Sequence, residues 1–501
     1  MKPISESIKQ KPWLGWLIFL GTMVIVFLLG LIASSIIERR AEAVFAYTPM
    51  VEHEDWEPRA EVWGINFPRQ YETYLQTADT SFVSKYNGAR KIDMLANGPE
   101  LVVLWAGYPF SKEYNQGRGH MWAIEDVQNI LRTAAPMSPS DGPMPGTCWT
   151  CKGPDVPRMM KNIGIAEFYS STFAELGPEI VNPVGCADCH DQQTMALQIT
   201  RPGLIEAFER QGKDISKSTH QELRSLVCAQ CHVEYYFKGE GSYLTLPWDK
   251  GFTMEAMEAY YDELAFSDWT HSVSRTPMIK AQHPDYEIFR FGVHYDRGVS
   301  CADCHMPYKS QGGVKFTSHH IQSPLNNVDN TCAVCHREEA DKLIQNVYQR
   351  QDALHETRVL LEEVLAKAHI EAKFAWDKGA TAKQMENALK LIRAAQWRWD
   401  YVGASHGSSF HAPFESARVI GLGLEKAQGA RIEITRVLAS LGYAETIPLP
   451  DISTKAKAQE YIGLNMKQLN AEKKEFLDAV VPNWLKQAME REATYPTKKF
   501  N

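Results

Sequence analysis

Paired cysteines are the residues of this chain best suited to chemistry. The 501 residues include ten cysteines, and each belongs to a Cys-x-x-Cys pair, which leaves none for a disulfide or a thiol nucleophile. A histidine directly after the second cysteine is the pattern of covalent c-type haem attachment, because the thiols bond the haem and the imidazole reaches its iron. Four motifs have this form: Cys186/Cys189/His190, Cys228/Cys231/His232, Cys301/Cys304/His305 and Cys332/Cys335/His336.

The fifth pair differs, because Cys148 and Cys151 are followed by Lys152. Lysine binds a metal through its neutral amine, although the pKa of the free side chain is about 10.4. Burial and metal binding together can lower that pKa enough. A haem held in this way, with its other face open, could bind and reduce a small anion. A decayed attachment site is the alternative interpretation.

Zinc is the rival cofactor for Cys-x-x-Cys pairs, because two pairs can supply four ligands to a structural site. Five pairs do not divide into such sites, and a histidine directly after the second cysteine is a feature of haem attachment. The sequence therefore favours haem.

Histidines outside the motifs are candidates for the second axial ligand of each haem. Iron held by histidine on both faces carries electrons, whereas catalysis needs an open position. Of 16 histidines, four belong to the motifs, and most of the other twelve must be ordinary surface or core residues. We interpret His355 and His369 as solvated, and His53, His220 and His271 carry no signal.

Long helices are predicted after the last cysteine pair. Residues 337–378 contain neither glycine nor proline, and their apolar residues recur at spacings of three, four or seven, which predicts an amphipathic helix. Its apolar stripe could pack within the chain or form a dimer interface. Further helices are predicted over residues 381–402, 415–441 and 455–490.

The five haem motifs and the long predicted helices indicate a mainly α fold, a multihaem cytochrome c fold with little sheet. The region with the cysteines is rich in Pro, Gly, Trp and Tyr, as expected where cofactors replace ordinary core. The net charge of -8 and the lack of a basic stripe argue against nucleic acid as a partner. We predict an N-terminal anchor or signal segment (1–45), a pentahaem catalytic region (46–337) and a long-helix region (338–501).

An apolar segment near the N-terminus predicts a membrane-spanning helix. Residues 13–37 are almost wholly apolar or small, with lysines before them, and about 20 such residues span a bilayer. The lysines favour a cytoplasmic N-terminus and an exported body. A cleaved signal is the alternative, since Ala41-Glu42-Ala43 offers a cleavage site.

Several segments together carry a family resemblance. The chain resembles the pentahaem cytochrome c nitrite reductases, which make ammonia from nitrite, over most of residues 56–425. The lysine motif followed by Gly-Pro-Asp-Val is similar to the family's active-site haem motif. Other similar segments are Leu131-Arg132-Thr133, Cys231-His232-Val233-Glu234-Tyr235-Tyr236 and Lys280-Ala281-Gln282-His283-Pro284-Asp285.

The resemblance implies a site that spacing alone does not identify. Lys152 would be the proximal ligand of the catalytic haem, and Arg132, Tyr235 and His283 would line its open side. Arginine and histidine suit an anion, and histidine and tyrosine can pass protons. Calcium would be held nearby by the side chains of Glu234 and Gln282 and the backbone carbonyls of Tyr235 and Lys280.

The resemblance also implies distal haem ligands. His319 and His411 are preferred over the neighbouring candidates His320 and His406. The implied ligands are His120 for the haem of Cys228/Cys231, His319 for Cys186/Cys189, His294 for Cys332/Cys335 and His411 for Cys301/Cys304.

The expected partners are nitrite, a second copy of the chain, and a membrane quinol-oxidising multihaem cytochrome that donates electrons. The expected location is the periplasmic side of the bacterial inner membrane, anchored by the N-terminal helix, or the soluble periplasm after cleavage. Two other functions stay open, a non-catalytic multihaem electron carrier and an oxidoreductase acting on hydroxylamine or sulfur oxyanions.

Overall fold

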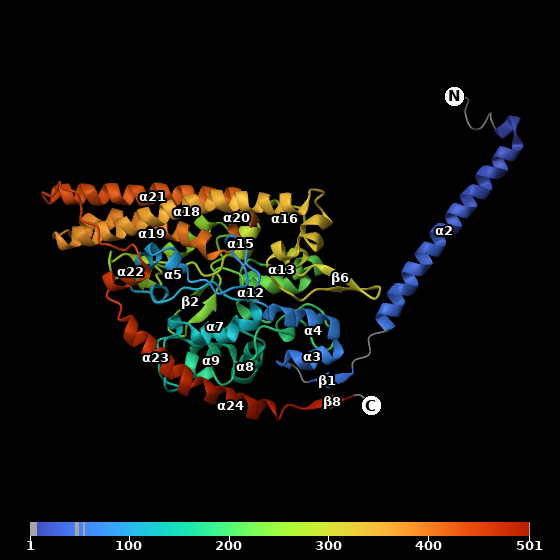
Figure 1. Cartoon of the computed structure of the whole chain (residues 1–501), viewed down its shortest axis with the longest axis horizontal. Helices are drawn as coiled ribbons and strands as arrows, with labels where there is room; N and C mark the ends of the chain where they lie inside the picture. The colour runs from blue at the N-terminus through green and yellow to red at the C-terminus, as the bar shows by residue number, and fades with distance from the viewer. Residues whose placement is uncertain (1–7, 46–49, 54–55, 500–501) are drawn as a thin grey trace. The chain divides into compact units, whose positions relative to one another are not determined.

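The computed structural model describes residues 8–45, 50–53 and 56–499 (Figure 1). The fold is mainly helical with short strands, which confirms the predicted class. The chain divides into two compact units, one made of residues 1–52 with 497–501 and the other of residues 53–496.

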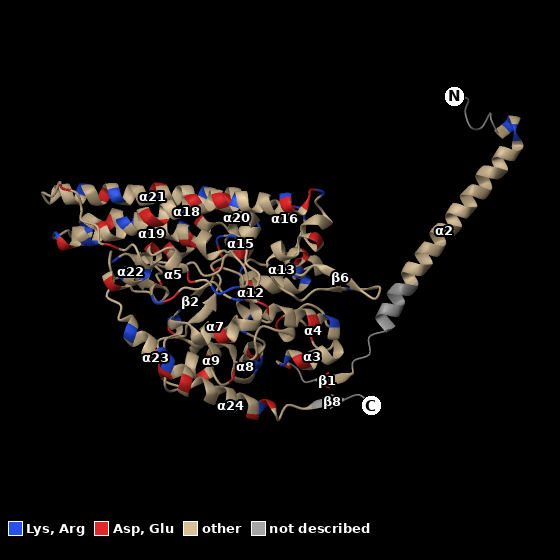
Figure 2. Cartoon of the chain, in the orientation of Figure 1, with Lys and Arg blue, Asp and Glu red and all other residues tan. Residues whose placement is uncertain are grey.

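The smaller unit contains helix α2 (Pro12–Phe45). Its stretch Pro12–Ile37 is 26 residues long, is apolar enough to cross a membrane, and buries none of its side chains in the protein. Figure 2 shows no charged residue along this stretch. By length and composition, α2 is a candidate membrane anchor or signal segment. In the same unit, β1 (Val51–His53) pairs with β8 (Thr497–Lys499).

Three long helices of the larger unit pack side by side (Figure 1). The hydroxyl of Thr381 starts the second one by accepting the amide of Gln384 at 3.3 Å, half of a capping box. Leu361, Leu365 and Ala372 are fully buried, so the predicted apolar stripe of the first helix packs within the chain. These helices, with a short one before the last, are α18 (Ala340–Asp377), α19 (Ala382–Ala404), α20 (Ser408–His411) and α21 (Pro413–Ser440).

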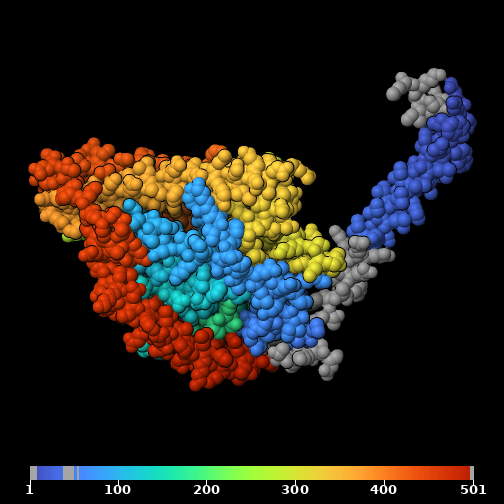
Figure 3. Space-filling view, viewed as in Figure 1, coloured from blue at the N-terminus to red at the C-terminus, as the bar shows by residue number. Residues whose placement is uncertain are grey.

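The stretch 455–490 forms three helices, where the sequence predicted one continuous helical stretch. Gly463 ends the first with a φ of +81°, which suits glycine, and Pro482 lies in the first turn of the third, where its missing N–H costs nothing. Figure 3 shows this segment in red along the outside of the body. We call residues 455–492 the C-terminal strap, formed by α22 (Lys455–Tyr461), α23 (Met466–Ala479) and α24 (Val481–Glu492).

The region with the cysteines is built from short elements, as expected for a chain that wraps cofactors. Its strands form antiparallel pairs, β2 (Tyr236–Lys238) with β3 (Tyr243–Thr245), β4 (Trp269–Thr270) with β5 (Pro277–Met278), and β6 (Tyr308–Gln311) with β7 (Val314–Thr317). Its helices are α3 (Ala60–Asn66), α4 (Pro68–Leu75), α5 (Met94–Asn97), α6 (Glu100–Leu104), α7 (Ala123–Asn129), α8 (Asp155–Ile163), α9 (Ile165–Ser170), α10 (Phe173–Leu176), α11 (Cys186–Cys189), α12 (Pro202–Arg210), α13 (His220–Ala229), α14 (Met254–Glu263), α15 (Asp285–Phe289), α16 (Val293–Asp296) and α17 (Cys301–His305).

The interpretation of His369 as solvated is wrong. His369 is fully buried and stacks on His271, with ring centroids 3.8 Å apart. Its two ring nitrogens lie 2.8 Å from the hydroxyl of Ser274 and 2.7 Å from the side-chain oxygen of Gln396. These satisfied contacts make His369 a polar core residue that joins α18 to α19.

Candidate active site

The lysine motif starts in a short 3-10 helix, η5 (Gly146–Trp149), which carries Cys148. Trp149 fixes this turn, because its buried ring stacks on Phe173 with centroids 4.3 Å apart. Its indole nitrogen also donates to the Phe173 carbonyl at 2.9 Å. The position of Lys152, directly after this anchored turn, is therefore set by packing.

Arg201 ties the lysine motif to the next haem motif, a role with no signal in the sequence. Its buried guanidinium donates to the carbonyl oxygens of Thr150 at 2.6 Å and Gly153 at 3.0 Å, on either side of Lys152. It also pairs with Asp188 of the Cys186/Cys189 motif at 2.5 Å. Because both charges are buried, the pair holds the two motifs at a fixed separation.

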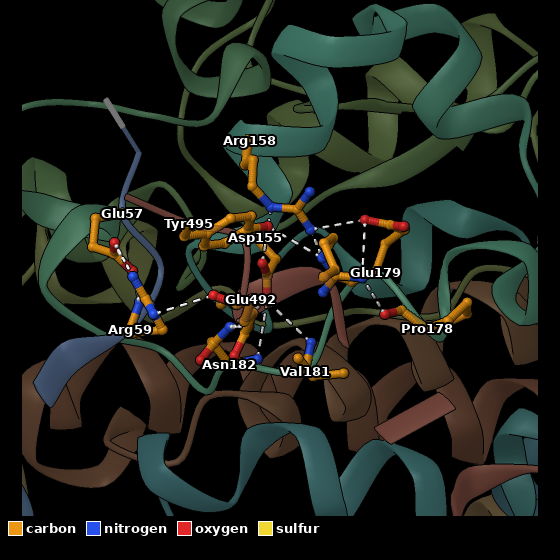
Figure 4. A network of polar contacts seen from close by, with 12 residues as sticks. Glu57, Arg59, Asp155, Arg158, Pro178, Glu179, Val181, Asn182, Glu492 and Tyr495 are labelled. Carbon is orange, nitrogen blue, oxygen red and sulfur yellow. Dashed lines mark hydrogen bonds and ion pairs between the residues drawn. The ribbon is translucent and has the colours of Figure 1, made fainter. Parts of the chain in front are cut away.

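Asp155 anchors the loop after Lys152 from the other side (Figure 4). Its fully buried carboxylate accepts the backbone amides of Val181 and Asn182, each at 3.0 Å. The side-chain amide of Asn182 donates to Asp155 at 3.0 Å and to Glu492 of the C-terminal strap at 2.7 Å. The strap thus reaches the lysine loop through one intermediate residue.

Arg132 lies in a 3-10 turn, η4 (Leu131–Thr133), with its guanidinium carbon 4.1 Å from the centre of the Phe110 ring. The start of the turn is fixed by Glu113, which accepts the Leu131 amide at 2.8 Å. Among the described residues, no carboxylate forms an ion pair with Arg132, and its buried Nε has no acceptor. Its positive charge is therefore available to an anion.

The residues implied by the family resemblance converge on the lysine motif. Burial raises the pKa of the Cys148 thiol, which Arg132 is near enough to lower, and the pKa of the Tyr235 hydroxyl, which Cys151 is near enough to raise further. Arg132 and Tyr235 also lie within electrostatic range of each other. His283 interacts in the same way with Lys152. The structure therefore brings Arg132, Tyr235 and His283 to the cysteine pair that precedes Lys152.

His283 and Asp285 form a compact group with a motif histidine. The Nε2 atom of His283 lies 3.1 Å from the Asp285 carboxylate, which is 3.4 Å from Nδ1 of His232. Ser405 donates to the same carboxylate at 2.6 Å. Burial lowers the pKa of His283 to about 3, and the neighbouring His232 acts in the same direction, which favours a neutral ring. The contact at 3.1 Å means that Asp285 orients the ring of His283, a role that the sequence did not reveal.

Two buried acids mark the region expected to bind calcium. Glu234 is fully buried and accepts the Gln282 amide at 2.6 Å and the Tyr261 hydroxyl at 2.9 Å. Glu287, also fully buried, accepts the backbone amide of Glu234 at 2.9 Å. In the described parts of the chain neither acid forms an ion pair, and burial raises the pKa of both carboxyls, that of Glu287 to about 8. A cation bound here would favour their charged forms. The carboxylate and carbonyl oxygens gathered here are ligands that calcium prefers.

A buried ion pair fixes the loop that joins these two regions. Lys280 is 3% exposed, and its ammonium pairs with Asp400 on α19 at 2.8 Å. Asp400 also accepts the amide of Ala281 at 3.0 Å. Helix α19 therefore holds the loop that supplies Lys280, Gln282 and His283.

Four pairs of histidine rings have the separation expected for two imidazoles bound to one metal. Metal–nitrogen bonds of about 2 Å on opposite sides place the ring centres about 6 Å apart. Each pair joins a motif histidine to one implied distal ligand, so these residues fit a haem. The centroid distances are 6.3 Å for His232 and His120, 6.1 Å for His190 and His319, 6.2 Å for His336 and His294, and 6.3 Å for His305 and His411.

The alternative histidines are placed differently. Nδ1 of His320 lies 3.0 Å from the side-chain amide of Gln322. The ring of His406 lies 5.9 Å from that of His283, nearly perpendicular to it. His319 and His411, rather than these neighbours, face motif histidines across the expected haem positions.

Cys335 differs from the expectation that the attachment cysteines lie where cofactors replace the core. Its side chain is exposed, whereas the other nine cysteines are half-buried. The reason is local, because Cys335 directly follows a 3-10 turn without a buried residue, η9 (Cys332–Val334), and residues 334–339 are all exposed. His336 still faces His294 at the separation given above, so Cys335 stays a predicted haem-binding residue.

Thiol contacts show which motifs adjoin one another. Cys151 of the lysine motif lies close to Cys231, and Cys228 of that second motif lies close to Cys301. The order in space is therefore the lysine motif, the motif of His232, and the motif of His305. Neighbouring haems in this order could pass electrons towards Lys152.

Comparisons with known proteins agree with this geometry. The model of the family described as cytochrome c552 matches residues 59–495. A cytochrome c-552 from Parabacteroides distasonis is 60% identical over 483 residues, covering 96% of this chain and 98% of the relative. A cytochrome c-552 from Maridesulfovibrio salexigens is 44% identical over 94% of this chain and 95% of its own length.

A solved structure has the same architecture. It is the cytochrome c nitrite reductase catalytic subunit from Desulfovibrio desulfuricans, which is described as having two calcium sites. The TM-score is 0.73 and the identity 32%, with coverage of 83% of this chain and 90% of that one.

Proposed function

Because this chain belongs to the cytochrome c552 family, we propose that it is an ammonia-forming nitrite reductase with five covalently attached haems c. The observation that carries the proposal is Lys152, which follows the one cysteine pair without a motif histidine. Arg132, which has no carboxylate partner among the described residues, interacts electrostatically with Cys148 of the same motif. The haem of this motif would supply the open iron position and the electrons for reduction.

The chain's own residues would bind the substrate and deliver protons. Arg132 attracts the nitrite anion, because its guanidinium lies in a buried turn and no described carboxylate pairs with it. His283, oriented by Asp285 as a neutral ring, can donate a hydrogen bond to the substrate, and the hydroxyl of Tyr235 can pass protons to the oxygen atoms that leave as water. Donors held in fixed positions favour cleavage of the nitrogen–oxygen bonds, since they require no rearrangement during the reaction.

The other haems would carry electrons through irons saturated by histidine. The pairs of His232 with His120, His190 with His319, His336 with His294, and His305 with His411 support bis-histidine ligation. We propose calcium at the side chains of Glu234 and Gln282 and at the carbonyl oxygens of Tyr235 and Lys280. The buried acids there, Glu234 and Glu287, form no ion pair with a described residue, which supports a cation site.

Ammonium formation tests the function directly. Purified protein with dithionite and a mediator should convert nitrite to ammonium, and a haem assay should give five haems per chain. A six-coordinate iron at every haem, with no spectral response to nitrite, would contradict the proposal and favour an electron carrier. Turnover of hydroxylamine or sulfite in preference to nitrite would favour the remaining alternative.

We also propose a place and partners for the enzyme. Residues 1–45 would anchor it on the periplasmic side of the inner membrane, beside a quinol-oxidising multihaem cytochrome. Residues 46–337 would hold the five haems, and residues 338–501 would supply a distal ligand and a dimer interface. The length of the uncharged stretch Pro12–Ile37 supports the anchor.

The mass of the mature protein should include the N-terminal helix. Protein extracted from membranes with detergent is expected to give an intact mass equal to the full chain plus its haems. A mature mass that lacks about the first 40 residues, as a cleaved signal predicts, would reject the anchor and leave a soluble periplasmic enzyme.

A further inference from the structure

We propose that Lys473, in the C-terminal strap, is a positioning residue that fixes the turn carrying Arg132. The inference deepens the proposed function, on which it rests. Lys473 lies on α23, which packs against both α7 and η4. Arg132 is the central residue of η4, so the strap contacts the turn that presents the charge for nitrite.

The ammonium of Lys473 has three acceptors, all in the segment around Arg132. It donates to the carbonyl of Gln128 at 2.8 Å, the hydroxyl of Thr133 at 3.2 Å and the carbonyl of Ala134. An ammonium has three donors, so all of its hydrogen-bonding capacity is used by this one segment. Lys473 is 5% exposed, so these bonds are shielded from water.

The turn η4 has a strained backbone that contacts from another part of the chain can stabilise. Ala134 adopts a φ of +57°, a backbone conformation that costs energy for a residue with a side chain. The hydroxyl of Thr133 donates within the turn to the carbonyls of Val127 and Ile130, at 2.8 and 2.9 Å, and so is free to accept from Lys473. Lys473 therefore holds the backbone on both sides of Arg132 in a single arrangement.

The position of the guanidinium depends on this backbone. Arg132 forms no ion pair with a described residue, so stacking on Phe110 and the backbone of η4 hold its side chain in place. If the turn relaxes, the charge moves relative to the lysine motif. A displacement of about 1 Å at a catalytic group can cost about 100-fold in rate.

The test compares Lys473→Met with Lys474→Met in the full-length, haem-loaded protein. Methionine keeps most of the length of the side chain and removes the donors, while Lys474 is an exposed neighbour that pairs with Asp478. We expect Lys473→Met to lower kcat/KM for nitrite by about 10- to 100-fold, chiefly through KM, with unchanged haem content. The Lys474→Met control should match the wild type.

A double-mutant cycle separates positioning from general stability. In protein already carrying Arg132→Gln, Lys473→Met should lower nitrite turnover no further, because the charge that Lys473 positions is gone. Hydroxylamine, which is uncharged at neutral pH, should lose less than threefold of its turnover. Multiplicative losses in the cycle, or equal losses for both substrates, would overturn the role of Lys473. A wild-type protein without nitrite turnover would instead overturn the proposed function itself.

Discussion

Replacing Lys152 with alanine is expected to abolish most nitrite reduction while leaving the four regular haems attached. Loss of a residue that only supports a metal ligand typically costs about 10- to 100-fold, so loss of the ligand itself should cost at least about 100-fold. The remaining motifs keep their cysteines and histidine pairs, and Arg201 and Asp155 still hold the loop. Ammonium assays, with haem content measured by absorbance, would check both parts of the expectation.

A matched control for this variant is Lys217→Ala, because Lys217 is highly exposed and pairs only at the surface with Asp214. It should retain full turnover. Near-normal nitrite reduction by Lys152→Ala would show that Lys152 is not the ligand, and would return the fifth motif to the interpretation of a decayed attachment site.

Replacing Arg132 with glutamine is expected to lower kcat/KM for nitrite by about 100- to 1000-fold, the usual cost of losing one preorganised donor. The guanidinium interacts electrostatically with Cys148 of the lysine motif and lacks a carboxylate partner among the described residues. Since the loss is electrostatic, hydroxylamine turnover should fall much less than nitrite turnover. Steady-state kinetics on both substrates would measure the difference.

Arg436→Gln provides the control for this second variant. Arg436 is a largely exposed arginine on α21 whose ion pair with Glu433 is a surface contact. Its removal should leave both activities unchanged. A parallel fall for nitrite and hydroxylamine in Arg132→Gln would mean that Arg132 supports the fold of the site and does not bind the anion.

The sequence predicts local features of this protein well and distant contacts poorly. The haem motifs depend on spacings within five residues, and the long helices on a repeat that persists over many turns. The distal pairings, by contrast, join residues brought together by the fold, such as His120 with His232 and His411 with His305. Family resemblance supplied these pairings, and spacing could not have done so.

Some buried polar residues left a signal that periodicity could have shown. His369 lies four residues after Leu365 and three before Ala372, on the apolar face of α18, where a solvated residue is not expected. Lys473 lies three residues before the buried Phe476 on α23. Arg201 left no such trace, because its partners Thr150, Gly153 and Asp188 come from two segments that are distant from it in the sequence.

The C-terminal strap implies an order for the steps of folding and haem attachment. Lys473 and Glu492 hydrogen-bond to residues that precede them by 345 and 310 positions. These contacts therefore form only after residues 455–492 have been synthesised. All five attachment motifs are synthesised earlier. Haem can therefore be attached to them before the strap contacts beside the active site have formed. For the same reason, proteolytic cleavage within the strap would weaken the support of the active site but leave all five haems attached, because residues 455–492 contain no haem ligand.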